Sequence, residues 1–391
     1  MNAETLAARA TEELARLVAF DTTSRGSNLE LIAHVEALLS ALGVPSRRIA
    51  NADGTKANLL ASIGPDVAGG VILSGHTDVV PVDGQPWSSD PWVLTPRGDR
   101  LYGRGTCDMK GFLALALAAV PDFATGRLKR PVHLAFSYDE EVGCLGAPDL
   151  IAEIAARVPT PAAVIVGEPT GMEAVSGHKG IAAFRVVVSG HEAHSSQTHL
   201  GVSANMAAIR LMASLSALAE RLEREADPAS PFTPKWPTLT IGLINGGTAL
   251  NILARECVFV FDLRTPHGVD PYDILADFFA EAEALDAAMK ARFADAGVVV
   301  ERRSRTPAMA IDPGGPAEAF ARRLAGDNGP TRAVPYAAEA GQFQQAGYSV
   351  VICGPGSIDQ AHQPDEYVEV SQIQRGAAFM VRLIEALSAE G

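Results

Sequence analysis

The segment Gly70-Val71-Ile72-Leu73-Ser74-Gly75-His76-Thr77-Asp78 contains a continuous apolar run that ends in polar side chains. An apolar run without alternation is typical of a strand buried in a mostly parallel sheet. His76 and Asp78 follow the predicted strand at once, and in open α/β sheets ligands bind just beyond the carboxyl ends of the strands. The segment therefore predicts both an architecture and the edge of the sheet where a functional site would lie.

The same order of an apolar strand followed by a ligand-type side chain recurs along the chain. The predicted strands and the residues that follow them are Val132–Tyr138 with Glu140 and Glu141, Ala162–Val166 with Glu168, and Tyr348–Cys353 with His362. Because the carboxyl ends of parallel strands meet at one edge of a sheet, these groups can converge. Asp108 has a different setting, the glycine-dense turn Gly103–Gly111 that leads into an apolar helix.

Five of these residues are potential metal ligands, and a sixth is a potential base. The five are His76, Asp108, Glu141, Glu168 and His362. The two oxygens of the Asp108 carboxylate allow it to bridge two cations. Two divalent cations can bring the pKa of a shared water close to neutral, and Glu140, next to Glu141 but pointing elsewhere, can take the proton. The set predicts a two-metal hydrolase of an amide bond.

Each residue also has an ordinary explanation when it is taken alone. His76 and Asp78 could form a capped turn, and Asp108 could be the N-cap of the helix that follows it. Glu168 and His362 could be polar loop residues. We favour metal binding because the groups occur together at several strand ends. The glycines around Asp108 match neither the dinucleotide nor the Walker phosphate-binding pattern.

Composition limits the classes of protein that the chain can belong to. Its 391 residues exceed what one hydrophobic core usually fills, so two domains are expected. The 47% of hydrophobic and 20% of charged residues indicate a soluble globular protein without long disorder. A net charge of −14 without a cluster of Lys and Arg argues against a nucleic-acid surface.

Cysteine usage and the N-terminus predict a cytoplasmic protein. The four cysteines are far apart in the sequence, which argues against a zinc ribbon or a disulfide framework and favours reduced thiols. Met1–Thr11 lacks a basic region followed by an apolar core, so no export signal is expected. The longest apolar stretch, Phe112–Val120, is too short to span a bilayer, and we expect no membrane partner.

The pattern of predicted elements changes between about Lys179 and Pro307. The order there is strand, helix, strand, strand, helix, strand, and the block supplies none of the five ligands. Such a block forms a small antiparallel sheet covered by two helices. We predict an α/β catalytic domain with a mostly parallel mixed sheet flanked by helices, residues 1–178 and 308–391. An inserted α+β domain for dimerisation or for covering the site would occupy residues 179–307.

Five segments resemble the co-catalytic zinc metallohydrolases, a family with acetylornithine deacetylase, succinyl-diaminopimelate desuccinylase, aminoacylase and carboxypeptidase members. The segments are Leu73–Pro81, Gly103–Gly111, Tyr138–Glu141, Gly167–Thr170 and Gly354–Glu366. The resemblance covers almost the whole chain. Gly354–Glu366 and Gly177–Gly180 look closest to the acetylornithine deacetylase branch, which implies hydrolysis of N2-acetyl-L-ornithine to ornithine and acetate in arginine biosynthesis. The alternatives are succinyl-diaminopimelate, another acyl-amino acid or a dipeptide as substrate, and a catalytically silent binding protein.

The resemblance implies a role for each metal ligand. Asp108 would bridge two Zn²⁺ ions, for which Co²⁺ or Mn²⁺ can substitute at such ligands. His76 and Glu168 would complete one metal site, and Glu141 and His362 would complete the other. By the same resemblance Glu140 would be the general base, Asp78 would orient His76, and the peptide bond after Asp108 would be cis.

The resemblance also assigns residues outside the ligand set. His194 would enter the active site of a partner subunit and hold the oxyanion, which implies a homodimer. His191 and His199 are expected to be its surface neighbours, although three histidines so close together could also bind a metal. Asn251 and Arg264 would bind the carboxylate of a small acylated amino acid.

Glu339 is the third predicted substrate-binding residue. It would contact the free α-amino group of a ligand. In this chain it follows Ala338, where the deacetylase branch carries a threonine.

Overall fold

Residues 2–389 are described by a computed structural model and form two compact units. The first unit runs to Gly177 and also contains Ile311–Arg332 and the chain from Ala338 onward. The second unit comprises His178–Ala310 and Ala333–Ala337, where the sequence analysis placed an insertion at residues 179–307. Among residues 2–389, no helix is both long and apolar enough to cross a membrane.

The first unit is built on a six-stranded sheet with the strand order β1-β2-β6-β3-β7-β14. The strands are β1 Ser46–Ala50, β2 Ala57–Ile63, β3 Val71–His76, β6 Val132–Ser137, β7 Ala163–Pro169 and β14 Val350–Gly354. Strands β6, β3, β7 and β14 run parallel, whereas β1 and β2 are antiparallel to their neighbours. The predicted mostly parallel mixed sheet is confirmed. Its central strands β3, β6 and β7 are buried along their whole length, in line with their mostly apolar sequences.

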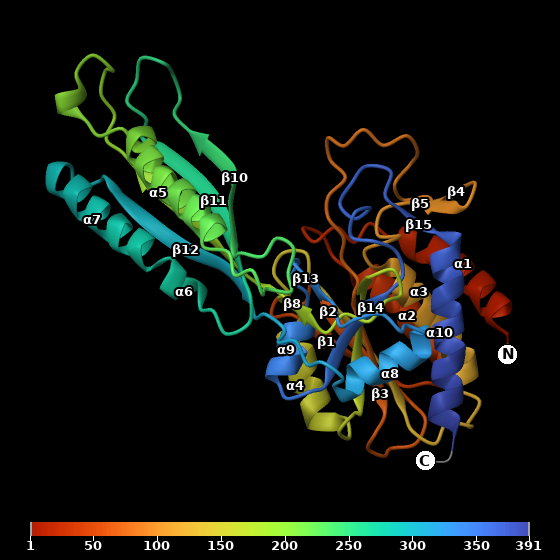
Figure 1. Cartoon of the computed structure of the whole chain (residues 1–391). Helices are drawn as coiled ribbons and strands as arrows, with labels where there is room; N and C mark the ends of the chain where they lie inside the picture. The colour runs from red at the N-terminus through yellow and green to blue at the C-terminus, as the bar shows by residue number, and fades with distance from the viewer. Residues whose placement is uncertain (1, 390–391) are drawn as a thin grey trace. The chain divides into compact units, whose positions relative to one another are not determined.

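Helices cover both faces of this sheet (Figure 1). One face shares a core with α1 Ala3–Val18, α2 Leu29–Ala41, α3 Lys110–Phe123, α8 Pro316–Ala325 and α10 Val370–Ser388. Helices α4 Ala147–Arg157 and α9 Ala340–Gln345 pack together and against strands on the other face. Helix α3 is buried almost all round because its sequence is apolar on every side. It therefore forms a rigid base for the turn that precedes it, which carries Asp108.

A small outer sheet joins two loops that are far apart in the sequence. It consists of β4 Thr95–Arg97, β5 Arg100–Tyr102 and β15 Tyr367–Glu369, with β5 in the centre. Tyr367 pairs with Tyr102, so the turn after β5 begins beside the point where the loop before β15 ends. This sheet could not be predicted from the sequence, since strands of three residues carry too few positions to show an alternation.

The second unit contains a four-stranded antiparallel sheet with the order β10-β11-β9-β12. Its elements are β9 Gly180–Ser189, α5 Ala204–Arg224, β10 Thr238–Gly246, β11 Glu256–Thr265, α6 Pro271–Ile274, α7 Ala276–Arg292 and β12 Gly297–Thr306 (Figure 1). Burial alternates along β9 and β11, which leaves one face of the sheet for the helices. The predicted α+β insertion is confirmed as a fold.

One predicted helix of this unit was too long. The helix predicted over Pro271–Arg292 is divided at Leu275, whose backbone angles of φ −90° and ψ 4° interrupt the helical turn. Three short elements complete the chain, namely the 3₁₀ turn Thr198–Leu200 and the paired strands β8 Gly177–His178 and β13 Ala333–Val334.

Candidate metal centre

The five predicted ligands come together at the carboxyl edge of the six-stranded sheet. His76 ends β3, Glu168 lies near the end of β7, and Glu141 follows β6. Asp108 lies in the turn before α3, and His362 lies in the loop after β14. They form two groups that share Asp108, and within each group one donor atom per residue lies within 4.8 Å of the others.

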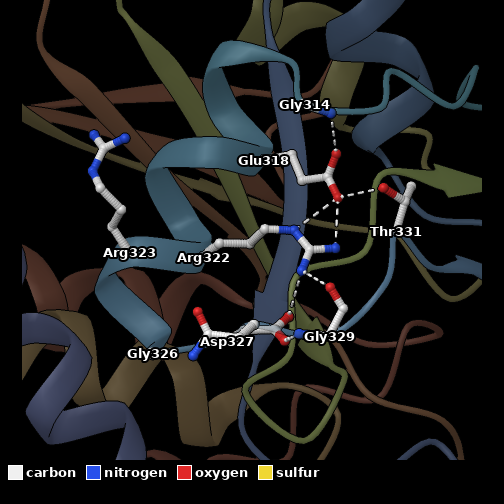
Figure 2. A pocket seen from close by; sticks show the side chains of 9 residues that line it. Gly314, Glu318, Arg322, Arg323, Gly326, Asp327, Gly329 and Thr331 are labelled. Atoms are coloured by element: carbon white, nitrogen blue, oxygen red, sulfur yellow. Dashed lines mark hydrogen bonds and ion pairs between the residues drawn. The ribbon is translucent and has the colours of Figure 1, made fainter.

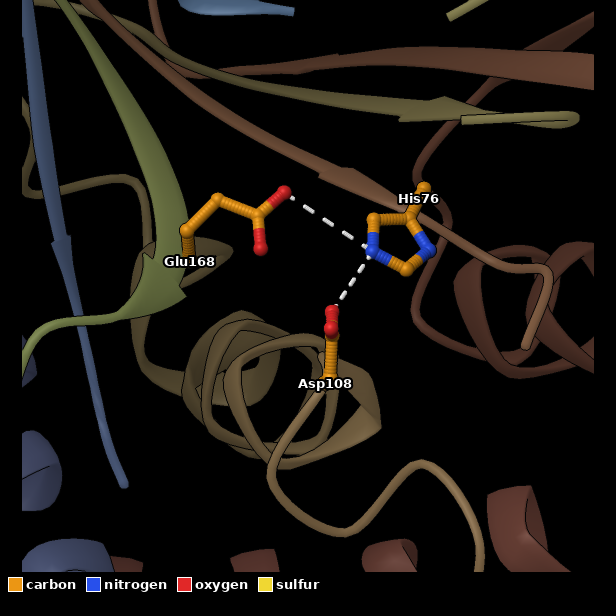
Figure 3. Close-up of side chains that lie close together, drawn as sticks. All are labelled: His76, Asp108 and Glu168. Carbon is orange, nitrogen blue, oxygen red and sulfur yellow. Dashed lines mark hydrogen bonds and ion pairs between the residues drawn. The ribbon is translucent and has the colours of Figure 1, made fainter. Parts of the chain in front are cut away.

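The first group consists of His76, Asp108 and Glu168, whose side chains point toward one another (Figure 3). The Nε2 atom of His76 lies 2.9 Å from Oδ1 of Asp108 and 3.7 Å from Oε1 of Glu168. All three side chains are buried, and that of His76 is only 1% exposed. One nitrogen and two carboxylates thus face a common centre inside the protein.

The second group consists of Asp108, Glu141 and His362. The Nε2 atom of His362 lies 3.0 Å from Oε2 of Glu141 and 3.3 Å from Oδ2 of Asp108. The two oxygens of Asp108 therefore face different histidines, Oδ1 toward His76 and Oδ2 toward His362. His362 is 49% exposed, so this group opens toward solvent whereas the first is enclosed. The peptide bond between Asp108 and Met109 is cis, as the resemblance implied.

Asp78 contacts both His76 and the loop that carries Glu141. The Nδ1–H of His76 donates to the main-chain carbonyl of Asp78 at 2.8 Å, which leaves Nε2 as the ligand atom of a neutral imidazole. The Asp78 carboxylate is 3.6 Å from Nδ1 and instead accepts the amides of Glu140 at 3.1 Å and Glu141 at 3.3 Å. It also accepts the hydroxyl of Ser24. Asp78 thus fixes the imidazole through its carbonyl and the neighbouring loop through its carboxylate.

Two buried oxygens of the candidate ligands indicate that the residues fit a pair of cations. Oε1 of Glu141 and Oε1 of Glu168 are buried and have no hydrogen-bond partner. Burying a carboxylate oxygen without a partner is unfavourable, and a coordinated cation removes that penalty. The donor set of imidazole and carboxylate groups suits Zn²⁺, Co²⁺ and Mn²⁺.

The ionisation of the ligands reflects their crowding. Burial and the charge of Asp108 raise the pKa of Glu141 to about 7, and they also raise the pKa of Glu168. Burial alone would raise the pKa of Asp108, but hydrogen bonds from His362 and His76 outweigh it and leave that pKa below its usual value. Burial would lower the pKa of His362, but Asp108 and Glu141 raise it to about 11. In the protein without cations, protons therefore compensate part of the negative charge.

Glu140, the predicted base, lies directly beside this cluster. Its side chain is partly buried, and the Sγ of Cys144 lies 3.3 Å from its Oε1. Burial, followed by the charge of Glu141, raises the pKa of Glu140 to about 8 against the opposing effect of His76. A carboxyl group with a pKa close to the working pH can both accept and donate a proton.

Three predicted residues belong to the second unit. The imidazole of His194 is exposed, and its Nδ1 lies 2.8 Å from the Ser196 hydroxyl. The loop that carries Asn251 runs beside it, since the Asn251 carbonyl accepts the amide of Ser195. Arg264, on β11, is one-third exposed and lies 3.5 Å from Asp262.

Glu339 belongs to the first unit and is almost fully buried, with an exposure of 1%. Its two oxygens accept the hydroxyls of Ser74 at 2.6 Å and Ser137 at 2.7 Å. It therefore lies between strands β3 and β6 with both oxygens bonded inside the protein.

Sequence reasoning missed the contribution of Glu366 and Arg104, which are both 1% exposed. They form an ion pair of 2.6 Å beside the turn that carries Asp108. Both residues lie in the quoted family segments, yet no local pattern distinguishes a buried Glu from a solvated one. The rule that buried charges are paired would have pointed to this ion pair, but it applies only once the burial of both residues is known from the structure.

Comparisons with known proteins agree with this geometry. The profile of Peptidase family M20/M25/M40 matches residues 72–386. The chain is 37% identical over 331 residues to an acetylornithine deacetylase from Proteus mirabilis, covering 84% of this chain and 82% of that one. It is 36% identical over 364 residues to an acetylornithine deacetylase from Salmonella paratyphi B, covering 92% and 91%.

Solved structures with the same fold include proteins named for peptide hydrolysis. Human carnosine dipeptidase 1 matches with a TM-score of 0.76 at 17% identity, covering 99% of this chain and 100% of that one. The aminopeptidase PepT from Bacillus cereus matches with a TM-score of 0.73 at 20% identity over 100% of both chains. A protein from Bacillus subtilis named as a dinuclear metal binding peptidase matches with a TM-score of 0.65 at 14% identity, covering 98% and 99%.

Binding of two divalent cations at pH 7 should release at least two protons, because His76 and His362 must lose theirs to become ligands, and the raised pKa values of the ligands Glu141 and Glu168 add to this number. Calorimetric titration of the chelator-treated protein in buffers of different ionisation enthalpy measures this number. His362→Gln should release about one proton fewer, and the surface variant His191→Gln should match the wild type. Affinity should rise with pH because protons compete with the cations. A binding heat independent of the buffer would contradict the assignment.

Proposed function

The chain belongs to the M20/M25/M40 peptidase family, and from this premise we propose that it hydrolyses N2-acetyl-L-ornithine to L-ornithine and acetate. The protein is a hydrolase of a metal-binding family. The proposed substrate is supported by relatives at 35–37% identity over most of the chain that are named acetylornithine deacetylase. The observation that carries the proposal is the pair of ligand groups sharing Asp108, with Glu140 beside them.

Two divalent cations, Zn²⁺ or in its place Co²⁺, would be held by His76, Asp108 and Glu168 on one side and by Asp108, Glu141 and His362 on the other. When bound, they would supply Lewis-acid activation of a water molecule and of the acyl carbonyl oxygen. The shared Asp108 fixes the distance between the two ligand groups, because each of its oxygens faces a different histidine.

Glu140 carries the proton transfers of the reaction. It accepts a proton from the attacking water and later gives it to the departing α-nitrogen, so that the C–N bond breaks to a neutral amine. Its place in the sequence next to Glu141 keeps the carboxylate near the ligands, and the Asp78 carboxylate holds the main chain of both residues. The loop therefore presents a ligand and a base with a fixed relative position.

Residues of the second unit and Glu339 would recognise the substrate and the transition state. Arg264 and Asn251 bind the substrate carboxylate, for which a planar guanidinium is well shaped. His194, exposed on its loop, donates to the oxyanion in the active site of a second copy. Glu339 accepts a hydrogen bond from the α-amino group freed by hydrolysis. This bond replaces the one that the hydroxyl of Ser74 or Ser137 donates.

We propose a homodimer in the cytoplasm, formed through one edge of the second unit. Strand β10 is an edge strand, and its Leu243 and Ile244 are 57% and 58% exposed. Met206 and Ile209 on the adjoining helix α5 are 65% and 52% exposed. An apolar edge strand invites pairing with another chain, and a second copy would cover it.

A panel of acylated amino acids tests the substrate. We expect the highest kcat/KM for N2-acetyl-L-ornithine, with N-succinyl-diaminopimelate and a simple dipeptide at least about tenfold lower, because discrimination depends on buried polar groups that a wrong substrate leaves unpaired. A preference for either of the other two would replace the proposed substrate while keeping the metal-dependent hydrolysis. Loss of all hydrolysis on chelation and its return with Zn²⁺ or Co²⁺ is the accompanying control.

Glu140→Gln should lower kcat by about 10²- to 10⁴-fold, because an amide cannot shuttle the proton. The variant should still bind two cations per chain, which metal analysis measures, since Glu140 is not a ligand. Asp139→Asn removes the neighbouring carboxylate that pairs with Lys56 and should change kcat much less. Near-normal turnover in Glu140→Gln would refute the role of Glu140 as base.

Ile244→Glu should convert the dimer into a monomer, because the new charge would be buried without a partner in the interface. The monomer should bind cations normally yet lose most of its turnover if His194 acts across the interface. Light scattering, metal analysis and kinetics on the same preparation measure these properties. Val299→Glu, on the opposite edge strand and 54% exposed, should remain an active dimer. Full activity in the monomer would contradict the assignment of His194.

A further inference from the structure

We infer that Glu366 is a positioning residue of the metal centre, which holds the turn Gly105–Asp108 so that the two oxygens of Asp108 face the two ligand groups. The inference rests on the proposed function, in which Asp108 bridges two cations. Glu366 acts on Asp108 only through the main chain, because all of its hydrogen bonds go to backbone amides and to Arg104.

Both oxygens of the Glu366 carboxylate are fully engaged. Oε1 accepts the amides of Cys107 at 2.9 Å and Asp108 at 3.1 Å. Oε2 accepts the amide of Gly105 at 3.0 Å and Nη1–H of Arg104 at 2.6 Å. A carboxylate with four donors around it is well satisfied where it lies and has no reason to turn toward a cation. Its effect on the centre is therefore one of orientation.

The turn depends on this carboxylate because it lies outside any helix or strand. Gly103 and Gly105 have φ angles of 158° and 79°, so the turn follows a path that ordinary helix or strand hydrogen bonds do not support. The amides of Gly105, Cys107 and Asp108 all point toward Glu366 instead. A ring of amides around one anion fixes the main chain of the bridging ligand.

The same carboxylate links the turn to the loop of His362. Glu366 follows His362 by four residues, and its own carbonyl accepts the amide of Gly103 at 3.0 Å. The pairing of Tyr367 with Tyr102 continues this connection. Asp108 and His362, which share the second ligand group, are thus held together by main-chain contacts that do not involve the ligand side chains.

Arg104 completes the arrangement as the counter-charge of Glu366. Its Nη2–H donates to Oε1 of Gln85 at 2.6 Å, and its guanidinium lies 5.0 Å from the ring centre of Trp87. It also donates to the carbonyl of Gln363 at 3.4 Å. Arg104 therefore connects the turn to the loop that carries Gln85 and Trp87, and it makes a second contact with the loop of His362 and Glu366.

A buried Glu–Arg pair could also serve stability alone, and the chain contains a matched pair for comparison (Figure 2). Glu318 is 2% exposed, pairs with Arg322 at 2.7 Å and accepts the amide of Gly314 at 2.8 Å and the hydroxyl of Thr331 at 3.0 Å. This pair ties α8 to its neighbouring loops in the first unit and contacts none of the five ligands. Its loss should affect folding only.

The experiment compares Glu366→Asp, Glu366→Gln and Glu318→Gln with the wild type. Co²⁺ alone is titrated into the chelator-treated proteins, and its visible absorption is followed in competition with a chelator. We expect both Glu366 variants to bind Co²⁺ about 10- to 100-fold more weakly and with altered absorption bands, the range found when a group that orients a ligand is removed. Glu318→Gln should keep the affinity within about twofold, although its melting temperature falls.

Glu366→Asp separates position from charge, because it keeps the anion but withdraws it from the amides by one methylene. In the metal-free proteins, amide hydrogen exchange over residues Gly103–Met109 should be faster in both Glu366 variants than in the wild type and unchanged in Glu318→Gln. If Glu366→Asp binds Co²⁺ like the wild type, the inference is wrong, even when Glu366→Gln binds Co²⁺ weakly or does not fold. If the wild type and Glu318→Gln bind no Co²⁺ either, the proposed function itself fails.

Discussion

The structure depends on how negative charge is compensated at one edge of a buried sheet. Asp108, Glu140, Glu141 and Glu168 lie close together with little exposed surface, and the imidazoles of His76 and His362 face this cluster. Burial and the charge of neighbouring carboxylates raise the pKa of Glu141 to about 7 and that of Glu140 to about 8, so these two groups hold protons close to neutral pH. Such a cluster is unfavourable on its own and becomes favourable when cations take the place of the protons. Both the crowding of negative charge and the positions of the ligand side chains therefore favour the binding of cations.

A second set of carboxylates holds the main chain of the loops that carry the ligands. Asp78 binds the amides of Glu140 and Glu141, and Glu366 binds those of the turn before α3. Each turn is thereby fixed by an anion from a distant segment, so the ligand side chains need not be held by direct contacts that would compete with a cation. These anions add to the negative charge of the region, which explains why Glu366 comes with the buried Arg104. Glu366 thus fixes the position of the turn, and Arg104 compensates the negative charge that Glu366 adds.

The sequence predicts the elements whose signal is local and misses those whose signal is not. The strands β3, β6 and β7 and the ligand at or just after the end of each could be recognised, because burial on both faces gives a mostly apolar run without alternation. Strand β1, which is mostly exposed, shows no such run and was missed, as was the whole outer sheet of three-residue strands. Glu366 could not be recognised because its partners lie 258 to 262 positions away in the sequence. Even Asp78 was assigned only half of its contacts, since the sequence suggested its link to His76 but not its hold on the loop after β6.

The five ligands and the base all belong to the first unit, whereas three of the residues proposed to recognise the acyl-amino acid belong to the second. Solved structures with TM-scores of 0.73 to 0.76 are named for the hydrolysis of peptides, and the curated relatives are named for deacetylation of an amino acid. A common fold therefore does not determine the substrate. One unit supplies all five candidate metal ligands and the proposed base, while the second unit supplies the proposed oxyanion donor His194 and the proposed carboxylate-binding residues. Specificity can then change through residues of the inserted unit such as Arg264 without disturbing the buried charges on which the chemistry depends. This separation gives a physical reason why one metal centre can serve several substrates, and why the substrate of this chain must be decided by residues outside the ligand set.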